Sequence, residues 1–91
     1  MGPLWIDEIE IDPHIEDKLW AKHHVEVAEV EEICFGEHRA ERTREGLYLV
    51  LGQTDAGRYL AAILASKGGG LWKIVSAREM TETERRRYSQ A

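Results

Sequence analysis

Three apolar segments in the second half of the chain constrain the fold more than any other feature of the sequence. They occupy residues 47–53, 58–66 and 71–77. The stretches between them, TDAG (54–57) and KGGG (67–70), are short and consist largely of turn-forming residues. Connections of this length join neighbouring strands as hairpins. The sequence therefore predicts an antiparallel meander, and residues 38–45 are a further candidate strand leading into it.

The first half of the chain predicts one strand and two helices. Residues 4–11 interleave apolar and acidic side chains, which is typical of a half-buried edge strand. Asp12 and Pro13 form an N-cap followed by proline at the first helical position, so a helix should start there and break near residues 22–25. A second helix is expected over 26–35, ending at Gly36.

A third helix is expected at the end of the chain. Thr81 precedes Glu84 by three residues, the capping-box spacing in which each side chain satisfies a backbone N–H of the first turn. The helix should run to about residue 89. These elements predict a single α+β domain, residues 1–91, with the helices packed against one face of an antiparallel sheet.

The composition indicates the cellular compartment in which such a chain is expected to function. The sole cysteine, Cys34, rules out an internal disulfide and fits a reducing compartment. No apolar run approaches the roughly 20 residues of a membrane-spanning helix, and the N-terminus lacks the pattern of a secretory signal. We therefore expect a cytoplasmic protein without membrane contact.

The net charge of −5 conceals an asymmetry between the two halves of the sequence. Residues 1–45 carry 13 acidic and 5 basic side chains (−8), whereas residues 46–91 carry 4 acidic and 7 basic side chains (+3). Proteins that bind nucleic acids usually present a basic surface. Only the second half is expected to contribute strongly to such a surface.

A set of short motifs recurs in one order along nearly the whole chain. A strand precedes a helix that starts with Asp-Pro, a Lys-His pair precedes the second helix, and the meander ends in VSAR before the last helix. The residues that carry this pattern are Asp12-Pro13, Lys22-His23, Gly52, residues 75–78 and residues 81–88. The pattern resembles the BrnT family, ribonuclease toxins of bacterial type II toxin–antitoxin systems that have a RelE-like fold.

The resemblance implies a small endoribonuclease that works without metal or cofactor. It also implies a cognate antitoxin, of the ribbon-helix-helix type, that holds the enzyme inactive. Metal-free RNA cleavage needs a base for the ribose 2′-OH, an acid for the leaving 5′-oxygen and cations for the phosphorane. The implied catalytic residues are Lys22, His23, Arg78 and Tyr88, and the implied substrate-binding residues are Arg44 and Arg85.

Several of these residues also have a purely structural explanation. Arg78 can clamp a phosphate or pair with Glu45 or Glu79 at the end of its strand. Tyr88 can pack on the sheet or reach the cleft beside Arg78. The arginines at 85–87 can compensate the dipole of the last helix instead of contacting RNA. The four histidines show no spacing that would form a zinc site, so no metal site is expected.

A second function stays open on sequence grounds. The family commonly carries a G-E-x-R pattern on the first meander strand, but Leu47 stands at the arginine position here. The first half is also strongly acidic, whereas RNA affinity depends on phosphate contacts. These departures are compatible with a catalytically degenerate interaction module that binds a protein partner or a second copy of itself.

Overall fold

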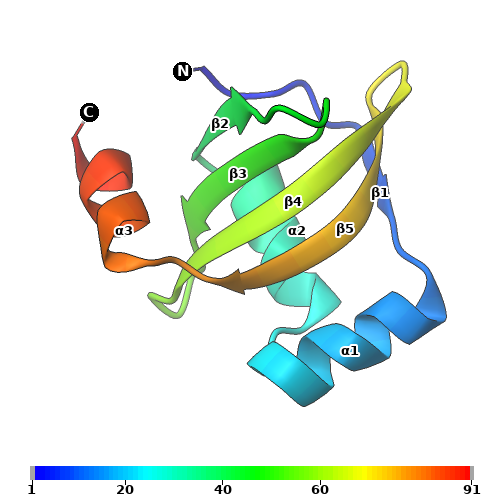
Figure 1. Cartoon of the computed structure of the whole chain (residues 1–91), viewed down its shortest axis with the longest axis horizontal. Coiled ribbons are helices and arrows are strands. Elements are labelled where there is room, and N and C mark those ends of the chain that lie inside the picture. The colour runs from blue at the N-terminus through cyan, green and yellow to red at the C-terminus, as the bar shows by residue number, and fades with distance from the viewer. Residues whose placement is uncertain (1, 91) are drawn as a thin grey trace.

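The computed structural model describes residues 2–90. Along the chain the elements are β1 (Glu8–Glu10), α1 (Pro13–His23), α2 (Val27–Phe35), β2 (His38–Arg42), β3 (Tyr48–Gln53), β4 (Tyr59–Gly68), β5 (Leu71–Glu79) and α3 (Glu82–Ser89) (Figure 1). The predicted α+β class, with a meander, two helices before it and one after it, is confirmed. None of the helices in residues 2–90 is long and apolar enough to cross a membrane.

The five strands form one sheet in the order β1-β5-β4-β3-β2. β3 pairs antiparallel with β4, and β4 with β5, as the two hairpin signals predict, and the candidate strand before them, β2, pairs antiparallel with β3. β1 lies at the predicted edge, but it runs parallel to β5, with Glu8 opposite Leu71. The sheet is therefore mixed instead of wholly antiparallel. No local signal marks this pairing, because the two strands come from opposite ends of the chain.

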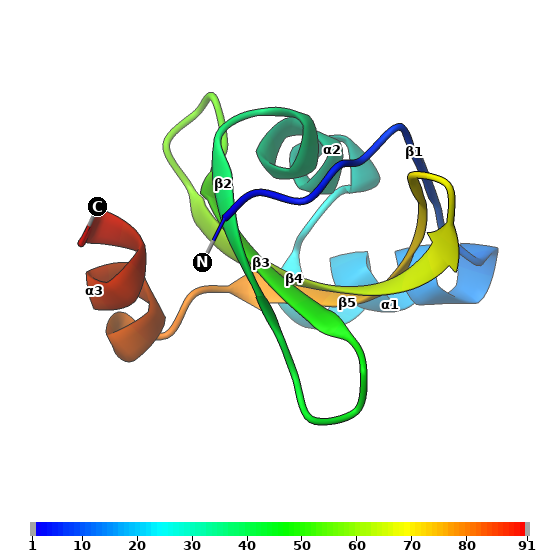
Figure 2. The same cartoon turned by 90° about the horizontal axis from the view of Figure 1, so that it is seen from above.

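The two faces of the sheet are covered by different helices. α1 and α2 bury one face, and α3 lies away from them near one end of the sheet (Figure 2). Leu49 and Leu51 point to the face opposite α1 and α2. On that face Tyr88 of α3 packs against the cluster that these two leucines belong to. The expectation that all helices share one face is thus wrong for α3. The physical reason is that three consecutive apolar residues, 49–51, require cover on both faces.

Close contact between α2 and the sheet depends on a glycine of β3. A Cβ atom at Gly52 would lie 2.7 Å from the Cβ of Ile33 in α2. Ile33 is fully buried, so it has no room to move outward. The helix can approach β3 this closely only because residue 52 has no side chain.

The first residues of the chain run along the outer edge of β2. The Gly2 carbonyl accepts a hydrogen bond from the Ala40 N–H, at 3.2 Å. The Leu4 N–H donates to the imidazole Nε2 of His38, at 2.9 Å. Residues 2–4 thus partly cover the β2 edge of the sheet, and β1 forms the opposite edge.

Candidate active site

The end of α1 determines where Lys22 and His23 project. The helix stops because His24 adopts the left-handed conformation, with φ 53° and ψ 41°. Its N–H returns to the carbonyl of Trp20 at 2.9 Å, which closes the last turn. Arg58, which immediately precedes β4, donates to the His24 carbonyl at 2.9 Å. This bond ties the end of α1 to the start of β4.

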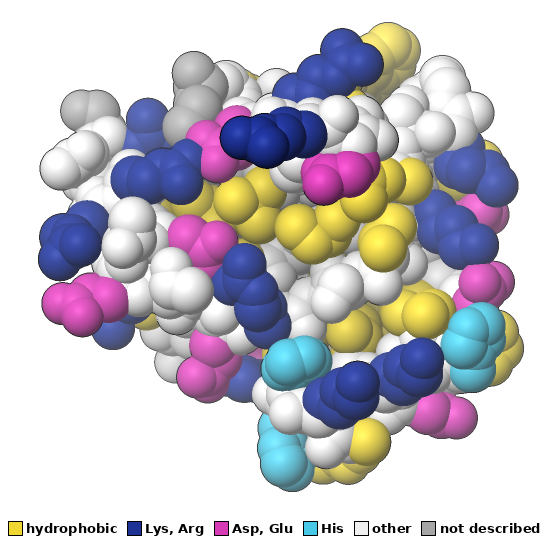
Figure 3. Space-filling view, in the orientation of Figure 1, with side chains coloured by type: hydrophobic (Ala, Val, Ile, Leu, Met, Phe, Trp, Pro, Cys, Tyr) yellow, Lys and Arg dark blue, Asp and Glu magenta, His cyan; other side chains and the backbone are white. Residues whose placement is uncertain are grey.

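The end of α1 faces the end of β5 across a basic depression of about 450 Å³. Lys22, His23 and His24 come from the end of α1, Arg58 from the position just before β4, and Arg78 and Glu79 from the end of β5. Figure 3 shows basic and histidine side chains gathered over α1, beside an apolar stretch of the sheet. Three of the four predicted catalytic residues, Lys22, His23 and Arg78, therefore line one depression.

Arg78 is held in place by a residue that sequence reasoning did not pair with it. Its guanidinium makes two hydrogen bonds to the carboxylate of Glu84, at 2.7 and 3.0 Å. The pair is neither of the two predicted from sequence, Glu45 and Glu79, although Arg78 does donate to the Glu79 backbone carbonyl. The hydrogen bond from Arg78 holds the pKa of the Glu84 carboxyl below its usual value.

Glu84 also completes the capping box of α3. Its carboxylate accepts from the Thr81 N–H at 2.9 Å, and the Thr81 hydroxyl accepts from the Glu84 N–H at 3.2 Å. The predicted capping box is confirmed. One buried carboxylate therefore fixes both the start of α3 and the orientation of Arg78.

Arg58 is a component of the depression that sequence reasoning missed. Its guanidinium bonds the Glu29 carboxylate at 2.9 and 3.0 Å and the Glu79 carboxylate at 3.1 Å. No motif includes this residue. The predicted hairpin could have indicated its position, because antiparallel pairing of β4 with β5 brings the start of β4 beside the end of β5, where Arg78 lies.

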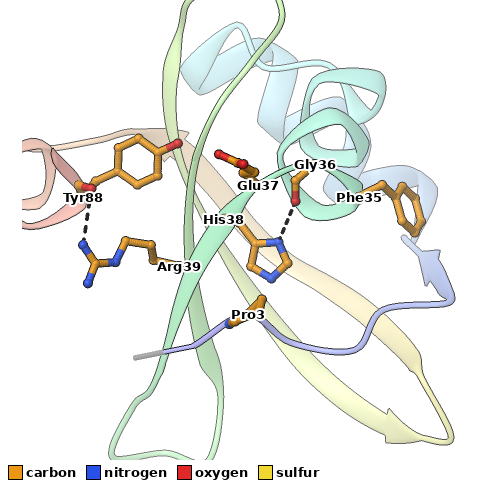
Figure 4. A pocket seen from close by; sticks show the side chains of 7 residues that line it. All are labelled: Pro3, Phe35, Gly36, Glu37, His38, Arg39 and Tyr88. Carbon is orange, nitrogen blue, oxygen red and sulfur yellow. Dashed lines mark hydrogen bonds between the residues drawn. The ribbon is translucent and has the colours of Figure 1, made fainter. Parts of the chain in front are cut away.

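Tyr88 lines a different depression, of about 770 Å³, with residues of the α2–β2 connection. Figure 4 shows its ring beside the strand that carries His38 and Arg39. Tyr88 also meets the ring of Tyr59 edge-on, with 6.1 Å between centroids. Of the two sequence alternatives for Tyr88, packing on the sheet is the one observed.

The two predicted substrate-binding arginines lie outside the basic depression. Arg44 is exposed in the turn between β2 and β3. The guanidinium of Arg85 stacks 4.0 Å from the centroid of the Tyr59 ring. Within residues 2–90, no three His, Cys, Asp or Glu side chains are grouped so that they could hold a metal ion.

Comparison with solved structures finds this fold in a ribonuclease toxin. That protein is BrnT from Brucella abortus, which superposes with a TM-score of 0.70 at 18% sequence identity. The match covers 82% of the present chain and 97% of the Brucella protein. No protein-family model matches the sequence, and no curated protein does. The BrnT-like fold implied by the order of motifs is thus confirmed.

Proposed function

We propose that this protein is a toxin of the BrnT type, an endoribonuclease that cleaves RNA without a metal ion. A single observation carries the proposal: Lys22, His23, Arg58 and Arg78 line one depression in a fold shared with a ribonuclease toxin. Lys22 and His23 come from α1, Arg78 from β5, and Arg58 from the turn immediately before β4. They supply the residue types that metal-free phosphodiester cleavage requires.

In the proposed reaction, the neutral imidazole of His23 takes the proton of a ribose 2′-OH. The 2′-oxygen forms a bond to the adjacent phosphorus while the bond from phosphorus to the 5′-oxygen breaks. The ammonium of Lys22 gives a proton to the departing 5′-oxygen. The products are a 2′,3′-cyclic phosphate and a 5′-hydroxyl, and exchange with water restores both side chains. Arg58 and Arg78 stabilise the charge that develops on the phosphorane.

Residues outside the depression take other parts in this proposal. Arg44 and Arg85 are exposed cations that can contact RNA phosphates away from the reacting bond. Tyr88 lines the other depression, so we leave it out of the catalytic group. We also propose that the protein is cytoplasmic and that an antitoxin of the ribbon-helix-helix type neutralises it.

The first prediction is cleavage of RNA by the purified protein in EDTA. A pool of defined single-stranded RNAs should be cut, and His23→Ala and Lys22→Ala should each lower the rate about 100-fold or more, the usual contribution of a general acid or base. His14→Ala is the matched control, because His14 is an exposed histidine at the other end of α1 and does not line the depression.

Intact RNA at high protein concentration, both free and on translating ribosomes, would contradict this prediction. So would cleavage that His23→Ala and Lys22→Ala leave unchanged. Growth arrest on expression, relieved by His23→Ala and by the co-expressed antitoxin, is the corresponding result in cells.

A specific observation favours a second candidate, a catalytically degenerate interaction module. Both arginines of the depression already have carboxylate partners: Arg78 binds Glu84, and Arg58 binds Glu29 and Glu79. A phosphate must compete with these carboxylates. Normal growth of cells that express the protein without any antitoxin, together with stable binding to a protein partner, would favour this candidate.

A further inference from the structure

A second, smaller depression continues from the basic one along α1. It has a volume of about 200 Å³ and lies between α1 and β5. Lys22 and His23 line both depressions, so the two are contiguous. The remaining lining residues are Ile15, Lys18, Leu19, Val75 and Ser76. Its volume is below the roughly 300–1,000 Å³ of pockets for drug-sized ligands, which suits a single ring system.

A β-bulge shapes the β5 side of this depression. Ser76 pairs with Ile63 and Ile74 pairs with Leu64, so Val75 has no partner in the ladder with β4. Consecutive residues of a regular strand point to opposite faces. Here the bulge lets Val75 and Ser76 line the same depression, and it leaves Val75 39% exposed.

The outer edge of β5 is also open at this point. β1 pairs only with residues 71–73, so within residues 2–90 no strand pairs with that edge of β5 from Ile74 onward. Backbone N–H and C=O groups on an unpaired strand edge are free to bond another molecule. α1 lies alongside β5, and the depression is formed between them.

The charges on the α1 side are cations without partners. Lys18 and Lys22 are four residues apart and lie on one side of the helix. Within residues 2–90, neither makes an ion pair, whereas the other two lysines, Lys67 and Lys73, pair with Glu10 and Asp12. None of the described residues that line this depression is acidic. The two lysines whose charge is not offset by an ion pair thus flank the same small pocket.

We propose that this depression binds the RNA nucleotide next to the scissile phosphate. The inference rests on the proposed function. The base packs on Ile15 and Val75, and its polar edge bonds Ser76 and the open backbone edge of β5. Lys18 contacts the phosphate that follows the one bound at Lys22. Val75 and Lys18 are therefore substrate-binding residues, and this pocket selects which base stands beside the cleaved bond.

The test combines cleavage with binding of RNA that cannot be cleaved. Lys18→Gln should raise KM several-fold with little change in kcat. Binding can be measured by fluorescence anisotropy with oligonucleotides that carry a 2′-deoxy residue at the cleavage position. In this assay Lys18→Gln should reduce the magnitude of the slope of log K against log salt by about 0.7, which corresponds to the loss of one phosphate contact to a single strand. Lys67→Gln is the control, because it removes the same charge at the hairpin between β4 and β5.

Two substitutions of Val75 test the apolar wall. Val75→Asp should raise KM and change the base preferred beside the cleaved bond, whereas Val75→Ile should preserve both. Because the side chain is exposed, both variants should fold, and thermal unfolding checks this.

The outcomes separate this inference from the proposed function. If the wild type cleaves RNA, and Lys18→Gln and Val75→Asp leave KM and the cleavage positions unchanged, the subsite is wrong and the ribonuclease proposal stands. If the wild type binds uncleavable RNA through Lys18 but never cuts RNA, the subsite stands alone. If it neither binds nor cuts, both are overturned. Loss of antitoxin binding alone in these variants would assign the pocket to a protein partner and overturn the subsite.

Discussion

The pair formed by Arg78 and Glu84 bears on both the stability of the fold and the proposed function. The Glu84 side chain is only 10% exposed, and it bonds both the Arg78 guanidinium and the Thr81 N–H. Replacing Arg78 by alanine would leave this carboxylate buried without its cation. Loss of activity in Arg78→Ala would therefore combine loss of a phosphate contact with loss of stability. His23→Ala, at an exposed position, is the cleaner probe of catalysis.

Glu84→Gln is predicted to destabilise the protein by about 1–2 kcal/mol at pH 7, because it weakens hydrogen bonds to a charged group. The pKa of Glu84 is lowered in the folded state from its ordinary value of 4.5. A lowered pKa stabilises the fold above the unfolded value, and this contribution is lost as the pH falls through the folded value. The difference between wild type and Glu84→Gln should therefore shrink below pH 4.5.

Urea unfolding across that pH range measures the difference. Glu82→Gln is the control, since its side chain is 88% exposed and makes only a surface pair with Arg86. If the difference in unfolding free energy between wild type and Glu84→Gln stays constant down to about pH 3, the Arg78–Glu84 pair is not the source of the pH dependence of stability.

At the scale of elements, the contact between α2 and β3 is predicted to tolerate added volume poorly. Gly52→Ala should destabilise the fold by roughly 1–3 kcal/mol, because its Cβ would meet the fully buried Ile33 at 2.7 Å. Gly2→Ala, with open space around it, should leave the melting temperature unchanged. Equal melting temperatures for Gly52→Ala and wild type would show that α2 moves away at no cost.

Local patterns account for most elements that sequence reasoning placed correctly. Asp12-Pro13 predicts the start of α1, Gly36 the end of α2, and the spacing of Thr81 and Glu84 the start of α3. Each of these signals lies within a few residues of the feature it marks. The strands of the meander are predicted for the same reason, since short turns fix which segments pair.

Features that depend on distant residues could not be read in this way. The parallel pairing of β1 with β5 and the bonds from Arg58 to Glu29 and Glu79 join segments far apart in sequence. The bulge at Val75 has no glycine or proline to mark it. The sequence accordingly predicted the residue types in the candidate site better than their partners, and it grouped Tyr88 with Arg78 although the two line different depressions.

For the whole molecule, the balance of charge predicts a weak dependence of RNA binding on salt. The net charge is −5, and the arginines of the basic depression are already paired with carboxylates. If only Lys18 and Lys22 contact phosphates, the slope of log K against log salt should be about −1.4 for single-stranded RNA. If Arg58 and Arg78 exchange their carboxylates for phosphate, four contacts should give about −2.8.

Anisotropy titrations at several salt concentrations distinguish these two values. Glu79→Gln removes one carboxylate beside Arg58 and should increase affinity by making that guanidinium more available. A slope near zero would mean that phosphate contacts contribute little, which would contradict binding of RNA at these lysines.

The parallel pairing of β1 with β5 bears on how the protein is made. During synthesis, β1 leaves the ribosome first, yet its partner strand is the last of the sheet to appear. Lys22 and His23 are likewise synthesised well before Arg78, which lines the depression with them. Because contacts between distant segments form late, an unfinished chain has neither the complete sheet nor the assembled depression. If the proposed ribonuclease activity resides in this depression, a nascent chain therefore lacks that activity while its own message is still being translated.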